Sequence, residues 1–470
     1  MQHKDELAAR PAMDDSVAPA RFFQTMKIAS SFLISVFVAV TVLPIPTGWS
    51  DVGPARARQV QSEPEKASEP APVKTLPKSP VPRHPVQQQR TQEEPIPSAD
   101  WMGEVRKRLI YDDLEIHPRF RAEHVLDSNV LLEARDEKLD NIFREVPGIE
   151  VVLPIGDHYV KADYETQFEQ YVKTNNNNTE NQEFKTEVAL NFTDMYIVTK
   201  ESISHTTSRA GTTFTERIPR FENDVSTHVG YKFNRFTLDS GYGNFYRSFD
   251  TSREKNLNYR TNKWMGNLAM DLTAKTKMFV DYVFTDYDYS KDPTRDGVGN
   301  QIAGGLQGSF LPKTSLYSKF GYERVSFGTA GEIDSNNFVA EVGALYEPVA
   351  KTTIDVGWKR QTAQSTFANT NFFTEDRLFV RLRHDFTEKI SGETGIAYAN
   401  QDYDERNNFG AGAFLGKRDD DLLTIDVKLL YQFTDWLSGD IKYQYNRRDS
   451  NASLFDYTDN LLVTGLALQV

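Results

Sequence analysis

Charged side chains recur at every second position in several extended stretches of this chain. Between residues 378 and 386, Arg381, Arg383 and Asp385 alternate with aliphatic or aromatic residues. Successive side chains of a β-strand point to opposite faces, so this spacing gathers the charges on one face and the apolar groups on the other. Such a face has two uses that the residues alone do not separate. It can select what passes a polar surface, or its charges can pair across strands and stiffen the interior.

The densest basic group with this alternation is our candidate for a solute path. Lys359 and Arg360 lie on one predicted strand, and Arg381 and Arg383 lie on the next. The candidate path comprises Lys359, Arg381, Arg383, Asp385, Lys428, Lys442 and Arg448. The wider set of candidates for the same face is Lys161, Asp163, Glu165, Lys185, Glu187, Lys232, Asp239, Asp281, Lys319, Glu323, Glu341, Asp355, Asp426 and Asp440.

Other kinds of chemistry have weaker support. Asp286, Asp288, Asp292 and Asp296 crowd one segment, and residues 419–421 are all Asp. Carboxylate oxygens suit Ca²⁺, but the spacing departs from that of an EF-hand loop, and exposed acidic loops are the simpler interpretation. No short Ser, His or metal motif joins the eight histidines. We therefore predict no catalytic, cofactor-binding or metal-binding residue and do not expect an enzyme.

Tight turns recur about every 40 residues from residue 192 onward, each after Phe, Tyr or Leu. Longer polar segments rich in Asn, Asp, Ser and Gly lie between them. A transmembrane β-barrel has this asymmetry, with short turns on one side of the membrane and longer loops on the other. The predicted turns are Phe192–Met195, Phe233–Phe236, Leu272–Lys275, Phe310–Lys313, Tyr346–Val349, Phe386–Lys389 and Phe433–Trp436.

The alternating stretches are longer than those of soluble proteins, whose strands usually stop at about 5 or 6 residues. A soluble β-sandwich also alternates, so the strand length and the aromatic residues at strand ends favour a membrane barrel. The first predicted strand is Glu115–Asn129, the last is Tyr457–Val470, and we count about 18. The sequence therefore predicts an all-β fold, a transmembrane antiparallel β-barrel over residues 113–470, with both ends on the periplasmic side.

The composition excludes several classes of protein. Hydrophobic residues make up 39% of the chain and the mean hydropathy is −0.55. This argues against a membrane protein of many helices, because each spanning helix needs about 20 mostly apolar residues. The net charge of −13 lacks the basic surplus that a nucleic-acid binder needs. Because the chain has no cysteine, it has no disulfide and no thiolate site.

Two segments precede the predicted barrel. Residues 1–57 are a predicted signal or targeting segment, since Ile28–Leu43 is an uncharged apolar run and Ala55–Ala57 offers a cleavage site. An uncleaved anchor is the alternative. Residues 58–112 are rich in Pro and polar residues, which predicts a disordered periplasmic linker that acts as a spacer or a tether. Ser98–Leu114 could form one short helix there.

The first predicted outer loop has a helical pattern of apolar residues. Leu132, Leu139, Ile142 and Phe143 have this spacing within Leu131–Phe143. We expect a short helix that either lies on the rim of the barrel or folds inward as a constriction, and the rim is the simpler interpretation.

Three outer hairpin ends repeat the triplet Asp-Ser-Asn, at residues 127–129, 334–336 and 449–451. Together with the opening stretch from His117 and the strand that starts at Tyr457, these triplets resemble the outer-membrane family called putative beta-barrel porin type 2, over about residues 113–470. The resemblance implies an outer-membrane barrel, and members often accompany exopolysaccharide synthesis machinery. The chain departs from most outer-membrane barrels in ending on Val470 rather than on an aromatic residue.

The resemblance implies a pore of the cell outer membrane that exports exopolysaccharide. A general porin for small solutes and a non-conducting structural or adhesive barrel are the alternatives. The expected partners are membrane lipids and lipopolysaccharide, periplasmic polysaccharide-export components and the polysaccharide itself, with no nucleic acid and no cofactor. Because charges of both signs occur in similar number on the candidate face, a strongly acidic polymer is not favoured.

Overall fold

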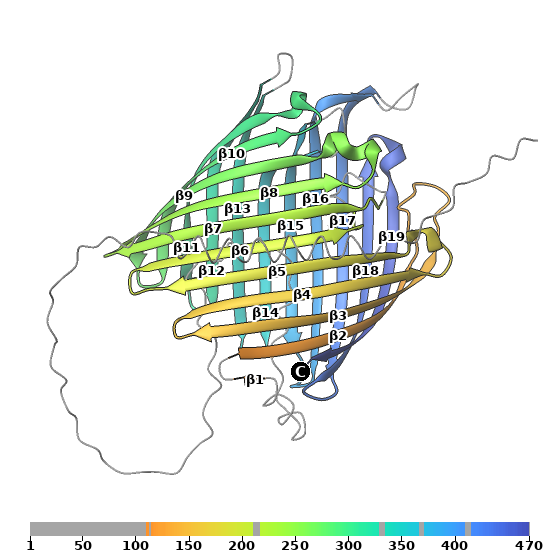
Figure 1. Cartoon of the computed structure of the whole chain (residues 1–470), viewed down its shortest axis with the longest axis horizontal. Coiled ribbons are helices and arrows are strands. Elements are labelled where there is room, and N and C mark those ends of the chain that lie inside the picture. The colour runs from red at the N-terminus through yellow and green to blue at the C-terminus, as the bar shows by residue number, and fades with distance from the viewer. Residues whose placement is uncertain are drawn as a thin grey trace, which may run out of the picture. The chain divides into compact units, whose positions relative to one another are not determined.

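The computed structural model of this chain describes residues 110–111, 114–209, 217–328, 334–365, 371–408 and 415–469, without the side chains of 110–111, 404–408 and 415. In this part of the chain, eighteen antiparallel strands, β2 to β19, form one ring, in which each strand pairs with the next and β19 pairs with β2 (Figure 1). The closed ring leaves no free strand edge, as a membrane requires. This confirms the predicted all-β antiparallel barrel and the predicted number of strands.

The strands of the ring are 12 to 19 residues long. Short 3-10 helices, η1 Asn175–Asn177, η2 Ser252–Leu257, η3 Pro293–Arg295 and η4 Ser453–Phe455, lie in four of the longer loops. The strands are β2 Leu114–Asp127, β3 Asp140–Ile155, β4 His158–Tyr171, β5 Thr179–Asn191, β6 Met195–Thr206, β7 Arg220–Phe233, β8 Phe236–Phe249, β9 Tyr259–Thr273, β10 Thr276–Tyr289, β11 Gly297–Leu311, β12 Thr314–Phe327, β13 Ser335–Val349, β14 Thr352–Gln364, β15 Phe372–Asp385, β16 Ile390–Asn408, β17 Leu415–Gln432, β18 Leu437–Ser450 and β19 Tyr457–Gln469.

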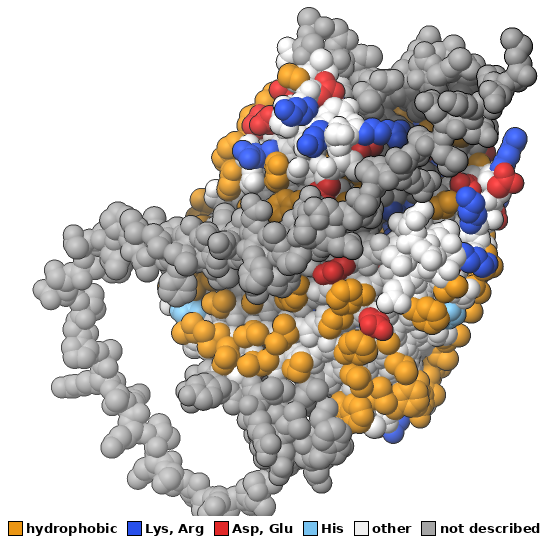
Figure 2. All heavy atoms as spheres, turned by 45° about the vertical axis from the view of Figure 1, so that its right-hand side comes forward, with side chains coloured by type: hydrophobic (Ala, Val, Ile, Leu, Met, Phe, Trp, Pro, Cys, Tyr) orange, Lys and Arg blue, Asp and Glu red, His pale blue; other side chains and the backbone are white. Residues whose placement is uncertain are grey.

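The two faces of each strand differ in chemistry, as the alternation predicts. Large apolar residues at every second position are exposed, for example Trp264 at 47% and Leu378 at 49%. Figure 2 shows such hydrophobic side chains gathered over a broad zone of the described surface. Exposed apolar residues are stable there only against lipid, so this face is the outer face of the barrel. The alternate residues, many of them charged, face the lumen.

Short turns join the strands at one end of the barrel and longer loops join them at the other. Six of the seven predicted turns lie where the sequence places them. The turn expected at Tyr346–Val349 lies instead at residues 350–351, because β13 continues to Val349 with a register shift after Tyr346. A further turn, at Gly156–Asp157, was not predicted; Gly156 adopts a φ of 61° there, which favours glycine.

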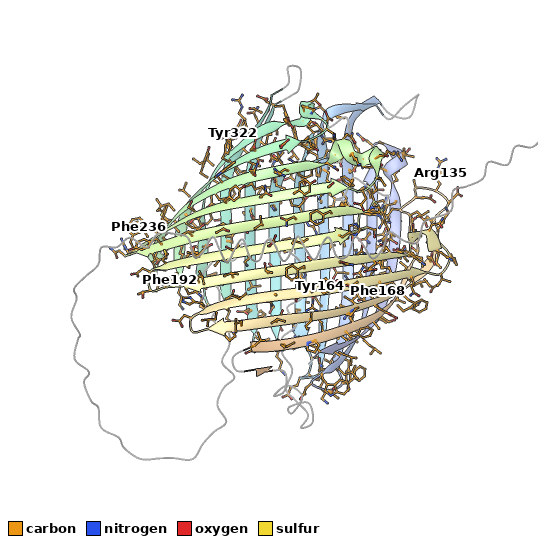
Figure 3. The ribbon with its side chains drawn as sticks, viewed as in Figure 1. Arg135, Tyr164, Phe168, Phe192, Phe236 and Tyr322 are labelled. Carbon is orange, nitrogen blue, oxygen red and sulfur yellow. The ribbon has the colours of Figure 1, made fainter. Side chains whose placement is uncertain are left out.

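The long-loop and short-turn ends can be followed in Figure 3, where Phe192 and Phe236 lie at the short-turn end and Arg135 lies in the first long loop. That loop contains no helix, so the helix expected at Leu131–Phe143 is wrong. The Asn129 side chain accepts a hydrogen bond from Glu133 N at 2.9 Å and donates one to Glu133 O at 2.8 Å. These bonds compete with helix formation, and the strand β3 takes the residues from Asp140 onward.

The predicted signal segment and most of the predicted linker lie outside the described residues. Ile110 and Tyr111, at the end of the range expected to be helical, form the short strand β1 paired with β2. Nowhere in the described ranges is a helix both long and apolar enough to span a bilayer.

Five outward tyrosines mark one edge of the apolar zone. Tyr282 lies opposite Ile302, and its hydroxyl donates to Asn300 Oδ1 at 2.8 Å, two residues further toward the long loops. Charged groups such as Arg324 and Asp334 lie beyond this level, and the hydrogen bond from Arg324 lowers the pKa of the Asp334 carboxyl. Aromatic residues flank the apolar band of membrane barrels in this way. The pairs with the same diagonal contact are Tyr242–Asn262, Tyr322–Asn336, Tyr398–Asp421 and Tyr443–Asn460.

Candidate functional site in the lumen

Every residue of the candidate path lies on the inward face of its strand, in phase with the other charged residues. The wider set of candidates lies on the same face. Arg360 does not, because adjacent residues of a strand cannot share a face. It points outward, and its Nη1 atom is 2.6 Å from Asp376 Oδ2. Lys359 and Arg360, which the sequence grouped together, therefore serve different surfaces.

Four inward residues form one row across four neighbouring strands. Lys319 on β12 lies opposite Glu341 on β13, Glu341 lies opposite Lys359 on β14, and Lys359 lies opposite Arg377 on β15. Lys319 Nζ is also 3.1 Å from Asp281 Oδ2 on β10. We call this set the β12–β15 row. It contains two cations, Lys359 and Arg377, side by side, an arrangement that costs stability unless other charges offset it.

A second row has the same order of charges nearer the short turns. Arg383 on β15 lies opposite Glu393 on β16, Glu393 lies opposite Lys428 on β17, and Lys428 lies opposite Lys442 on β18. We call this set the β15–β18 row. Because Arg377 and Arg383 share β15, the two rows are connected along that strand. The structure thus brings Lys359, Arg383, Lys428 and Lys442 onto one continuous part of the wall.

The remaining members of the candidate path have different surroundings. Arg381 lies between the rows, with its Nε atom 3.0 Å from Glu393 Oε1. Asp385 lies at the short-turn end, 3.6 Å from Arg383 Nε. Arg448 lies near the long loops with its side chain 2% exposed and its Nε atom 3.7 Å from Asp420 Oδ2. It is separated from both rows and buried beside Asp420 and the ring of Tyr457.

A chain of ion pairs crosses the seam where β19 meets β2. Arg121 on β2 contacts Glu123 Oε1 at 2.6 Å and Asp440 Oδ1 on β18 at 2.8 Å. Arg144 on β3 contacts Glu123 Oε2 at 2.7 Å and Glu169 Oε1 on β4 at 2.8 Å. Charge-assisted contacts of this length are strong in a half-buried site. We call these five residues the seam network; they join the first strands of the ring to its last ones.

Inward glycines let long side chains reach past a neighbouring strand. Arg121 spans β19 at Gly465, where a Cβ atom would lie 2.8 Å from Arg121 Nη2 and 3.0 Å from Asp440 Oδ1. Arg119 spans β3 in the same way at Gly148 to contact Asp163 Oδ2 at 2.7 Å. A side chain at either glycine would occupy the space of the guanidinium group. The glycines therefore permit ion pairs between strands that are not adjacent.

Charges from distant strands converge at the β12–β15 row. The ammonium group of Lys359 is close enough to interact with those of Lys319 and Lys263, as well as with Glu341 and Glu375. Lys263 belongs to β9, five strands from β14. The inward side chain of Lys263 therefore lies within electrostatic range of the β12–β15 row.

Sequence reasoning missed a set of arginines stacked on aromatic rings near the long loops. Arg418 is fully buried, with its guanidinium 4.9 Å from the Tyr403 ring centroid, and Arg295 is 4.7 Å from that of Tyr289. Such contacts contribute roughly 0.5 to 2 kcal/mol each and stiffen the mouth of the barrel. The sequence signal for these pairs was the aromatic residues at the long-loop ends of the strands, at positions that share a face with the charged residues. The other pairs are Arg217–Tyr171 and Arg247–Tyr259, and Arg448 of the candidate path stacks on Tyr457 in the same way.

The aspartates considered for calcium make other contacts. Asp296 accepts a hydrogen bond from Tyr289 N at 2.6 Å, and Asp419 accepts one from Asn400 Nδ2 at 2.8 Å. Within the described ranges, no group of three or more His, Asp or Glu side chains is arranged to hold a metal ion. The polar chemistry of the site is therefore that of ion pairs and hydrogen bonds.

Comparison with solved structures finds bacterial proteins that are similar at low identity. The outer membrane protein opdK from Pseudomonas aeruginosa is 14% identical with a TM-score of 0.42, over 76% of this chain and 99% of that chain. OccAB4 from Acinetobacter baumannii is 13% identical with a TM-score of 0.45, over 76% and 98%. OccK2 (OpdF) from P. aeruginosa, in complex with glucuronate, is 11% identical with a TM-score of 0.44, over 76% and 99%.

No curated protein sequence matches the chain. The sequence model of the family described as putative beta-barrel porin 2 matches residues 115–470, which is most of the chain and the whole ring of strands. The chain therefore belongs to the putative beta-barrel porin 2 family, and its barrel lies in the outer membrane.

Proposed function

We propose that this protein is a conducting pore of the outer membrane through which an exopolysaccharide chain leaves the cell. The observation that supports a pore best is the inward face of the barrel, where charged groups continue from Asp385 near the short turns to Glu323 near the long loops. Amides such as Gln301 and Gln444 lie among them on the same face. A wall of this kind solvates a polar passenger that the hydrocarbon core excludes.

The exopolysaccharide part of the proposal rests on the family resemblance and on the width of the ring. Eighteen strands give a barrel in the size range of porins that hold an aqueous channel. A hydroxyl-rich chain needs hydrogen-bonding partners at every level of its passage, and the inward face offers donors and acceptors in both charged rows.

Deletion of the gene tests the export step. We expect the mutant to lose extracellular polysaccharide and to regain it with a plasmid copy of the full chain. Polysaccharide in the medium and in the periplasm is measured by total sugar assay after cell fractionation. Unchanged extracellular polysaccharide in the deletion mutant contradicts export, and if the purified protein still conducts, the same result assigns it to small solutes.

The segments before the barrel complete the proposal. We assign residues 1–57 to a cleaved export signal and residues 58–112 to a periplasmic linker. N-terminal sequencing of the protein extracted from outer membranes should then begin near residue 58. A mature protein that keeps Ile28–Leu43 would support an uncleaved anchor instead.

A further inference from the structure

We infer that the passenger of this pore is an uncharged carbohydrate chain rather than a polyanion, because the lumen wall is a lattice of balanced charges. This inference rests on the proposed pore function and specifies its substrate class. It goes beyond a count of charged residues, since it depends on which charges the register makes neighbours.

Each cationic row contains a carboxylate between cations. Glu341 lies between Lys319 and Lys359 in the β12–β15 row. Glu393 lies between Arg383 and Lys428 in the β15–β18 row. A negative charge therefore interrupts both stretches of wall where the sequence concentrates basic residues.

The level between the two rows has the opposite balance. Asp355 lies opposite Arg381, Arg381 lies opposite Gly395, and Gly395 lies opposite Asp426. Moving from the long-loop end toward the short turns, a passenger therefore meets a mainly basic level, a mainly acidic level and a second basic level. The seam network adds cations that are already paired with carboxylates.

Each row alone has three cations and one carboxylate, and the carboxylates that offset this excess lie beside the rows. They are Asp281 next to Lys319, Asp440 next to Lys428, Asp385 next to Arg383, and Asp355 and Asp426 between the rows. Inward side chains of adjacent strands start roughly 5 Å apart, so the fields of opposite charges largely cancel at greater distances. Salt screens what remains over about 8 Å at physiological ionic strength. The middle of the lumen then has little net potential. An extended polyanion gains little there and must also pass the carboxylates of every level.

A neutral carbohydrate matches the same wall. Its hydroxyl groups can donate to Glu341 or Glu393 and accept from Lys359, Arg377 or the lumen amides. Many weak contacts at successive levels suit a passenger that must move, because a single tight site would hold it. The charged side chains of the wall therefore supply hydrogen-bond donors and acceptors at successive levels of the lumen.

The test compares ion selectivity of the full-length protein and four variants in planar bilayers under a KCl gradient. We expect a permeability ratio of K⁺ to Cl⁻ close to one for the natural protein. Lys359→Gln should raise the ratio and Glu341→Gln should lower it, each by about twofold, the effect of one charge roughly 10 Å away in water. The double variant should return the ratio toward one.

Arg360→Gln is the matched control, because it removes the same charge from the adjacent residue on the outer face and should leave the ratio unchanged. In the same channels, neutral dextran oligosaccharides should reduce the current more than oligogalacturonates of equal length. Strong anion selectivity of the natural protein, or current block by the acidic oligosaccharide alone, overturns the inference while leaving a pore. Absence of conductance in every variant overturns the pore and the inference together.

Discussion

Two parts of the lumen wall use the same kinds of residue in different ways. In the seam network, Arg121 and Arg144 each contact two carboxylates at 2.6 to 2.8 Å. In the β12–β15 row, Lys359 and Arg377 lie side by side, and within the described part of the chain neither forms an ion pair. The charges of the seam network therefore pair with one another and hold the barrel closed, whereas the β12–β15 row exposes some of its charges to the lumen.

Alternation along a strand determines the face on which a residue lies, but not its role. Asp440 and Lys442 are separated by one residue on β18 and face the same lumen. The Asp440 side chain is 2% exposed and contacts Arg121 across the seam, whereas Lys442 lies opposite another cation, Lys428. What distinguishes the two positions is the neighbouring strand, in particular the space that Gly465 leaves for the guanidinium group.

Removal of the Asp440 carboxylate from the seam network should have the largest effect on stability. Asp440→Ala leaves Arg121 half-buried without one of its partners, and breaking a buried ion pair in this way costs about 3 to 5 kcal/mol. We expect the folded band to disappear at a lower temperature in a heat-modifiability gel. Asp385→Ala, which removes an exposed carboxylate at the short-turn end, is the control and should behave like the natural protein. Equal behaviour of the two variants would show that the seam network contributes no stability.

A side chain at Gly465, which would fill the space that Arg121 crosses over β19, should have an intermediate effect on stability. Gly465→Ala places a Cβ atom 2.8 Å from Arg121 Nη2 and displaces it from Asp440, for a cost of about 1 to 3 kcal/mol. Gly266→Ala is the matched control, because no atom lies within 4 Å of the added Cβ atom. Urea unfolding in lipid vesicles, followed by tryptophan fluorescence, measures both. A Gly465→Ala protein as stable as Gly266→Ala would contradict the proposed role of the glycine.

Removal of a charge from the β12–β15 row should have the smallest effect on stability. Arg377→Gln removes the like charge opposite Lys359, so we expect unfolding within about 0.5 kcal/mol of the natural protein. Arg119→Gln, which leaves Asp163 and Glu165 without their shared cation, should unfold clearly earlier. Urea unfolding in lipid vesicles measures the stability of both variants. A larger loss of stability for Arg377→Gln would show that the β12–β15 row stabilises the barrel, as the ion pairs do.

The barrel was predictable because its signals are local. The two-residue alternation and the aromatic turns determine the strands, their faces and the end of the barrel that has the short turns, and they need no knowledge of partners. The helix at Leu131–Phe143 was predicted wrongly because side-chain bonds from Asn129 outweigh apolar spacing. The rows and the seam network depend on register between strands, and Arg121 meets Asp440 across 319 residues of sequence. Spacing along the chain does not contain that information.

The most direct test of this account is the conductance of the purified full-length protein in planar lipid bilayers. We predict discrete, stable current steps in KCl for the natural protein, with little preference between K⁺ and Cl⁻. The Gly266→Ala variant should give the same steps. A correctly folded, heat-modifiable protein that produces no steps in any bilayer would contradict the pore and identify the barrel as a structural or adhesive one.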